Sequence, residues 1–306
     1  MTSPILLWTG FSVAVLAMLF IDFKLFSGKG KEIGIREALI WSAVWVGAAL
    51  LFNAGIMMFD KERAVNFTTG YLIERALSMD NIFVFILIFN FFRVPAIYQQ
   101  GVLFWGILLA LVLRVFFIGA GVILINMFHW TIYLMGAMLL FVGVKMLLHK
   151  EDEQNLAESK VLKLVKKLFP VTNDYHEDSF FIKKDGVRWA TPLFLVFVMV
   201  AAMDIVFAVD SIPAILAVTT DPFVVYTSNI FAILGLRALY SAVAALTGMF
   251  VYLNVGLCVI LVLIGCKMLA SDVVHIPVVW TLGLVGAVLL TSVIASLLFV
   301  KKVNVP

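Results

Sequence analysis

Two aspartates stand six residues apart in a stretch that is otherwise almost wholly apolar. They are Asp204 and Asp210 in AAMDIVFAVDSIPAILAV, residues 201–218, and a second acidic motif, ERALSMDN, carries Glu74 and Asp80. A charged side chain at the centre of a membrane-spanning helix costs roughly 2.5–3.5 kcal/mol on insertion scales. Such carboxylates must therefore face protein, water or a bound cation.

The side chains next to these acids also offer oxygen ligands. Asn81 follows Asp80, and Ser211 follows Asp210. Carboxylate, amide and hydroxyl oxygens suit Mg²⁺, Ca²⁺ and Mn²⁺, whereas zinc and copper sites usually recruit His or Cys. The sequence therefore predicts a divalent-cation site, with the ligand set Asp80, Asn81, Asp204, Asp210, Ser211 and Glu74.

Two methionines, Met79 and Met203, directly precede the aspartates of the two motifs. Their thioether sulfur could join the ligand set and favour Mn²⁺ over harder cations. The alternative is that both side chains only fill space in the core, as methionine commonly does.

Helical geometry places most of these groups on shared faces. At 100° per residue, Glu74, Ser78 and Asn81 lie on one face, and Asp204 and Ser211 lie on another. These two faces would have to meet for the ligands to form one site.

Asp210 lies off the Asp204 face if its helix is regular. Pro213 makes regularity doubtful, because proline removes one backbone hydrogen bond and crowds the carbonyl of Val209. We therefore expect a helix break at Pro213 that frees carbonyl oxygens beside Asp210 and Ser211. Unwound backbone inside a membrane is tolerated only where it lines a cavity or is buried in protein.

Two arginines, Arg114 and Arg237, are the expected internal countercharges. They would neutralise the carboxylates when no cation is bound. A purely structural alternative is that Asp80 pairs with Arg237 and Asp204 with Arg114, so that the ion pairs only hold helices together. That alternative leaves two acids without countercharge, Asp210 and Glu74.

The composition identifies a membrane protein. Of 306 residues, 63% are hydrophobic and 13% charged, and the mean hydropathy is +1.10. Soluble domains carry about 25% charged residues, so the chain is read as one all-α membrane domain. Because a spanning helix needs about 20 apolar residues, the sequence predicts nine spans: 5–25, 37–58, 68–92, 98–125, 130–148, 190–219, 223–246, 252–270 and 277–300.

Basic residues predict the orientation of these spans. Lysine and arginine concentrate in the odd-numbered loops, above all in the loop 149–189, and in the C-terminal tail. By the positive-inside rule those segments are cytoplasmic, so the N-terminus faces outward and the C-terminus inward. Within that loop, 161–169 has helical apolar spacing with lysines opposite. It is either a basic amphipathic helix on the inner membrane surface or a solvated linker helix.

An internal repeat relates the third to fifth spans to the sixth to eighth. Met79-Asp80 matches Met203-Asp204, Arg114 matches Arg237, and Lys145 matches Lys267, in the same order and at nearly the same spacing. A unit of three spans inverts its second copy, as in many secondary transporters with a binding site near the midplane. Repeat 1 covers about 68–148 and repeat 2 about 190–270, and the spans 5–25, 37–58 and 277–300 flank them.

Several of these strings resemble the TerC/Alx family of integral membrane proteins. They are GYLIERALSMDNIFVF (70–85), DIVFAVDSIPAILAVTTDPF (204–223), SNIFAILGLRALY (228–240) and GVKML (143–147), and the resemblance covers nearly the whole chain, 1–306. It implies a single TerC-like transmembrane domain. The chain is most similar to the Alx branch, whose members are described as manganese exporters of the bacterial inner membrane.

The resemblance implies a multi-pass secondary transporter that exports Mn²⁺ or another divalent cation and binds no permanent cofactor. Family members commonly carry glutamate at the position of Ala201, so one acid is missing here. The tellurite-resistance and thylakoid-insertion branches imply an alternative, a non-transporting membrane subunit or assembly factor. We expect no enzyme activity and no nucleic-acid partner. The bilayer and the metal are the expected partners, with homo-oligomerisation and membrane partner proteins left open.

Overall fold

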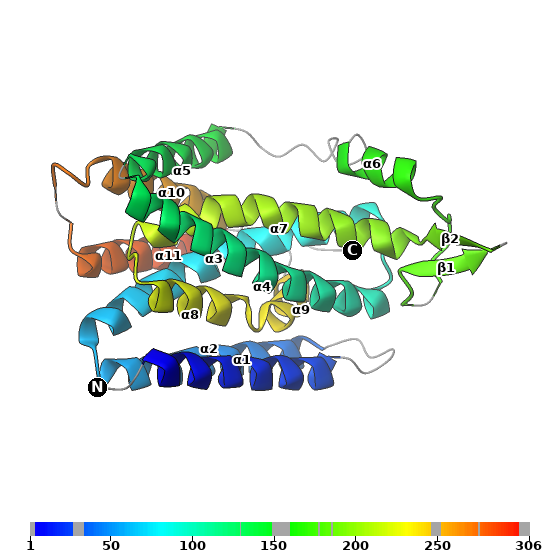
Figure 1. Ribbon diagram of the computed structural model, residues 1–306, viewed down its shortest axis with the longest axis horizontal. Coiled ribbons are helices and arrows are strands. Elements are labelled where there is room, and N and C mark those ends of the chain that lie inside the picture. The colour runs from blue at the N-terminus through cyan, green and yellow to red at the C-terminus, as the bar shows by residue number, and fades with distance from the viewer. Residues whose placement is uncertain are drawn as a thin grey trace.

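The computed structural model describes residues 4–26, 34–128, 130–148, 160–176, 178–184, 186–245, 252–274 and 276–299. This part of the chain is all-α apart from one two-stranded antiparallel hairpin. The long helices run roughly along the longest axis of the molecule (Figure 1). In chain order the helices and strands are α1 (Pro4–Phe26), α2 (Ile35–Met57), α3 (Lys61–Phe91), α4 (Ala96–Met127), α5 (Thr131–Leu148), α6 (Lys160–Leu168), β1 (Phe181–Lys184), β2 (Val187–Ala190), α7 (Pro192–Leu216), α8 (Pro222–Ile233), α9 (Leu236–Ala245), α10 (Leu253–Leu269) and α11 (Val278–Phe299).

Each predicted span falls on helix, and this confirms an all-α membrane protein. Within the described ranges, five helices are long and apolar enough to cross a membrane, and α8 with α9 adds a sixth if the bent pair counts as one span. The count of nine spans and their orientation remain predictions.

The predicted span 223–246 is not one continuous helix. It is divided at Leu234–Gly235 into α8 and α9, whose axes differ by 42°. Gly235 has φ +82°, and a Cβ there would lie 2.5 Å from Cδ1 of Trp45 on α2. Only glycine fits this combination of positive φ and close packing.

Arg75 on α3 compensates for the break. Its Nη1 donates a hydrogen bond of 3.1 Å to the carbonyl oxygen of Ala232, in the last turn of α8. The last carbonyls of a helix have no intrahelical donor, and a cation is favoured there. Arg75 therefore holds α3 to the end of α8.

The break expected at Pro213 is absent. α7 remains helical through Pro213 and ends at Leu216, where the N–H of Ala217 bonds to the carbonyl oxygen of Pro213. Proline still removes one hydrogen bond from the helix, but it does not unwind α7. The broken segment that borders the site belongs to α8 and α9 instead.

The two halves of the predicted repeat interlock. α3 packs against α8, α4 packs against α7, and α5 packs against α10. A pair of copies related by a twofold axis makes this pattern of contacts: first helix with second, second with first, third with third. The α5–α10 contact is close because Gly136 faces Gly265, where a Cβ would lie 2.8 Å from the Gly136 carbonyl oxygen.

α6 confirms the helix predicted over 161–169. Leu162 and Val165 are buried and belong to the main core cluster, whereas Leu164 and Leu168 are exposed. α6 and the β1–β2 hairpin lie at the end of the molecule opposite the N-terminus (Figure 1). Whether α6 lies on a membrane surface stays a prediction.

Candidate functional site

Arg114, on α4, is at the centre of a buried polar cluster. The residue is 1% exposed. Its Nη1 forms an ion pair with Glu74 of α3 and donates to Ser211 Oγ of α7 at 3.2 Å and to Asn229 Oδ1 of α8 at 3.1 Å. Groups from three other helices therefore converge on one guanidinium.

Asp204, on α7, approaches the same guanidinium less closely. Its Oδ1 lies 3.9 Å from Arg114 Nη2, which is beyond hydrogen-bonding distance. Asp204 is 7% exposed, so this carboxylate is buried without a full salt bridge. Glu74 therefore neutralises Arg114, and Asp204 remains as surplus negative charge.

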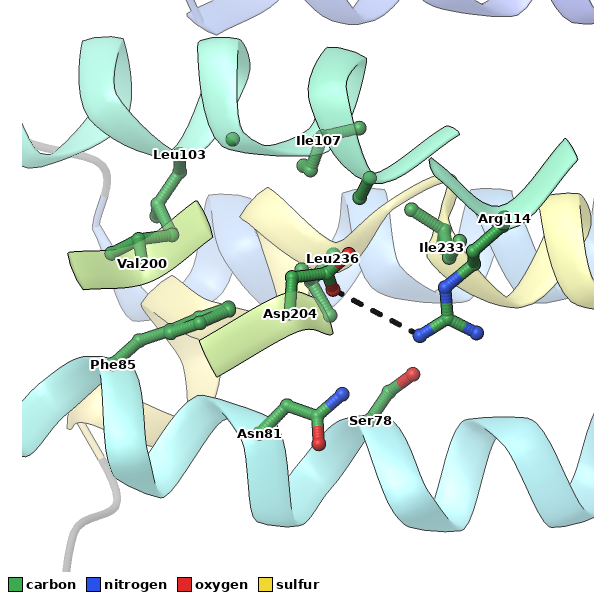
Figure 2. A pocket seen from close by; sticks show the side chains of 12 residues that line it. Ser78, Asn81, Phe85, Leu103, Ile107, Arg114, Val200, Asp204, Ile233 and Leu236 are labelled. Carbon is green, nitrogen blue, oxygen red and sulfur yellow. Dashed lines mark ion pairs between the residues drawn. The ribbon is translucent and has the colours of Figure 1, made fainter. Parts of the chain in front are cut away.

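A small pocket lies beside Asp204, between α3, α4, α7 and the α8–α9 break. Figure 2 shows Ser78 and Asn81 of α3 directed towards Asp204 and Arg114. The cavity volume is about 10 Å³, the space that one water or one ion needs. The rest of its wall is apolar: Phe85, Leu103, Gly106, Ile107, Ala110, Val200, Ile233 and Leu236.

Four buried polar atoms in this cluster have no hydrogen-bond partner among the described residues. Two are carboxylate oxygens, Oδ2 of Asp204 and Oε2 of Glu74, and two are donors, Nε of Arg114 and Nδ2 of Asn229. Buried polar groups are nearly always satisfied, and an exception points to an unassigned water or ion. The cluster thus has unused capacity for a small polar guest.

The structure brings together four of the six predicted ligands. Glu74, Asn81, Asp204 and Ser211 all line the pocket or bond to Arg114. The side chains of the other two, Asp80 and Asp210, lie outside the described residues. Within the described part, no three His, Cys, Asp or Glu side chains form a group that could hold a metal ion.

The structural alternative paired Arg114 with Asp204 and left Glu74 without a countercharge, but Glu74 is the closer ion-pair partner of Arg114. Met79 and Met203 pack against the main apolar core. This contact agrees with the packing alternative and gives no support to a thioether ligand.

Arg237 has a partner that the sequence reasoning missed. Its Nη1 lies 3.0 Å from Oδ2 of Asp22 on α1, and its Nε donates to Gln100 Oε1 of α4 at 3.3 Å. Both ion-pair partners are buried. Asp22 was recognisable, because it is an acid inside a predicted span.

Asn229 was also missed. It is 0% exposed and holds Arg114 through its Oδ1. In the sequence, Asn229 belongs to the string SNIF, which indicates this position only through the resemblance to the TerC/Alx family. No spacing rule links a residue of α8 to an arginine of α4.

The fold and this site define a class: an all-α, multi-helix membrane protein with a small pocket, lined by a buried aspartate and a buried arginine, where two sets of helices meet. A family model described as "Integral membrane protein TerC family" matches residues 59–304. The chain belongs to the TerC family.

Relatives resemble nearly the entire chain. A Myxococcus xanthus protein named "Uncharacterized membrane protein STKORF319" is 47% identical, covering 95% of this chain and 92% of the relative. Proteins from Salmonella typhi and Escherichia coli (strain K12), both named "Putative membrane-bound redox modulator Alx", are each 46% identical, covering 95% of this chain and 94% of the relative. No solved structure matches the chain.

Proposed function

We propose that the protein is a secondary transporter that exports a divalent cation, with Mn²⁺ as the expected substrate. The observation that supports this most is the buried Asp204 carboxylate, which has one oxygen 3.9 Å from Arg114 and the other without a hydrogen-bond partner in the described part of the chain. An uncompensated buried charge costs several kcal/mol. A cation in the adjoining pocket would remove that cost.

The division of charge supports a transported rather than a permanent ion. Glu74 keeps Arg114 neutralised, so Asp204 can turn to a cation without leaving the guanidinium unpaired. When the cation leaves, Arg114 is near enough to attract Asp204. A site whose charges are balanced both with and without the cation suits a carrier, because a cation that is bound tightly and never released would stop transport.

The donor chemistry supports a hard divalent cation. Asp204, Asn81, Ser78 and Ser211 supply carboxylate, amide and hydroxyl oxygen. These ligands suit Mn²⁺, Mg²⁺ and Ca²⁺ alike, and the Alx-branch resemblance favours Mn²⁺. An inward-moving proton or cation would drive export, because the sequence has no Gly-rich nucleotide-binding loop. We assign the protein to the bacterial inner membrane.

The test is Mn²⁺ efflux from loaded proteoliposomes. We expect Asp204→Asn and Asp210→Asn to reduce efflux to the rate of protein-free vesicles, while both proteins still insert. Asp174→Asn, at an exposed loop acid, is the matched control and should export normally. Unchanged efflux from both site variants would refute the proposal.

A second candidate is a membrane subunit or assembly factor that moves no ion by itself. The buried ion pairs Arg114–Glu74 and Arg237–Asp22 favour it, since each joins two helices. The same efflux assay separates the two candidates. Purified wild-type protein that binds but never moves Mn²⁺, with or without an imposed proton gradient, would support the subunit.

A further inference from the structure

Lys267 is a half-buried cation far from the Asp204 pocket, in the last turn of α10. Its Nζ donates a 3.0 Å hydrogen bond to Thr281 Oγ1 on α11. Among the described residues, no carboxylate forms an ion pair with it. An ammonium group has three N–H donors, and Lys267 uses one of them for Thr281. This charged group, which lies between two apolar helices, can therefore also bind an anion.

An apolar groove adjoins this ammonium group. It has a cavity volume of about 440 Å³ and lies between α10 and α11. The wall is aliphatic and aromatic except for Lys267, Thr281 and Cys266. Such a groove on adjacent apolar helices matches a hydrocarbon chain in shape and chemistry.

A wider hollow of about 730 Å³, with both polar and apolar lining residues, meets the groove at Lys267, Val274 and Ile276. Hydroxyl groups line it at Thr219, Thr220 and Ser271. Asn66 also lines it, with a buried Oδ1 that has no partner among the described residues. Lys61 and Glu62 both line the hollow and oppose one another in charge, so a preference for anions rests on Lys267.

We propose that this composite surface binds a phospholipid with an anionic headgroup. The acyl chain occupies the groove between α10 and α11, which Thr281 lines, and the phosphate lies against Lys267, where the groove meets the hollow. An ammonium group at the mouth of an apolar groove binds a phosphate through a charge-assisted hydrogen bond. The site is separate from the Asp204 pocket and does not depend on the transport proposal.

The repeat supplies a matched control. Lys145 occupies the corresponding position in α5, but it is exposed and lines neither hollow. Removing Lys145 changes the protein's charge by the same amount as removing Lys267. Any difference between the two variants therefore reports the surroundings of Lys267.

The experiment is native mass spectrometry of the full-length protein in detergent with added phosphatidylglycerol or phosphatidylcholine of identical acyl chains. We expect wild type to retain phosphatidylglycerol about fivefold better, the effect of one lysine at a lipid surface. K267Q should lose this preference, T281V should weaken it, and K145Q should retain it.

Equal retention of both lipids by wild type, or an undiminished preference in K267Q, would overturn the proposal. Helix content and elution volume check that each variant is folded. If K267Q fails to fold, the wild-type comparison and T281V decide the outcome.

Discussion

Arg114 bonds to groups from α3, α7 and α8, and Glu74 approaches it more closely than Asp204 does. This choice of partner determines what the other acid can do. With Glu74 in place, the guanidinium charge is neutralised and Asp204 stays available. The Glu74–Arg114 pair therefore stays neutral whether or not Asp204 binds a cation.

Glu74→Gln should lower Mn²⁺ affinity at least tenfold, because Asp204 would then be the one described carboxylate left to balance Arg114. Breaking a buried pair also costs about 3–5 kcal/mol of stability. Asp22→Asn is the matched variant, since it breaks the other buried arginine pair. Calorimetric Mn²⁺ titration and thermal unfolding of both variants measure the two effects.

We expect Asp22→Asn to destabilise the protein without changing Mn²⁺ affinity. Equal losses of affinity in both variants would mean that Arg237 acts with the site, as the sequence alone suggests. An unchanged affinity in Glu74→Gln would show that Glu74 does not set the charge on Asp204.

At this scale the sequence predicted which residues carry the charges of the site better than it predicted which of them form ion pairs. The energetic penalty on intramembrane charge identified Glu74, Asp204 and Arg114 without any structure. It could not assign partners, because ion pairs depend on which helix faces meet. Asp22 met the same criterion and was overlooked, whereas uncharged Asn229 gave no signal of comparable strength.

The element that shapes the pocket is the broken pair α8–α9. Ile233 and Leu236, on either side of the break, both line the pocket. Gly235 permits the turn, Trp45 fills the space beside it, and Arg75 caps the end of α8. The break is thus supported from α2 and α3.

Gly235→Ala should destabilise the protein by more than about 1 kcal/mol, since positive φ alone disfavours alanine by roughly that amount. The clash with Trp45 adds to it. Gly283→Ala is the control, because a Cβ there meets open space within α11. Thermal unfolding in detergent measures both, and equal midpoints would contradict the role given to Gly235.

Helices were more predictable than their interruptions. Long apolar runs leave helix as the only way to satisfy the backbone in lipid. Proline and glycine both weaken helices, but the sequence does not show at which of these residues a helix breaks. Pro213 is accommodated within α7, whereas the other span breaks at Gly235, which has a positive φ and a tryptophan of another helix where its Cβ would lie.

The whole molecule is electrically asymmetric along its long axis. α6 and the β1–β2 hairpin, which carry many of the lysines, lie together at one end (Figure 1). Lys61, by contrast, is the first residue of α3, directly after the short connection from α2. The positive-inside rule predicts that the hairpin end is cytoplasmic.

A cysteine at Lys184 should react with a membrane-impermeant maleimide only after cells are opened, whereas one at Lys61 should react in intact cells. The background is the protein with Cys258 and Cys266 replaced by alanine. The labelled fraction in intact and opened cells is the measurement. Reversed accessibility would invert the orientation and turn the proposed export into uptake.

The ion pair between Asp22 and Arg237 affects where the chain can be shortened without loss of a buried contact. The region matched by the family model starts at residue 59, yet Asp22 lies in α1, upstream of it. A polypeptide cut to residues 59–304 would deprive the buried Arg237 of this carboxylate. The region that the family model matches therefore lacks α1, the helix that supplies this partner to Arg237.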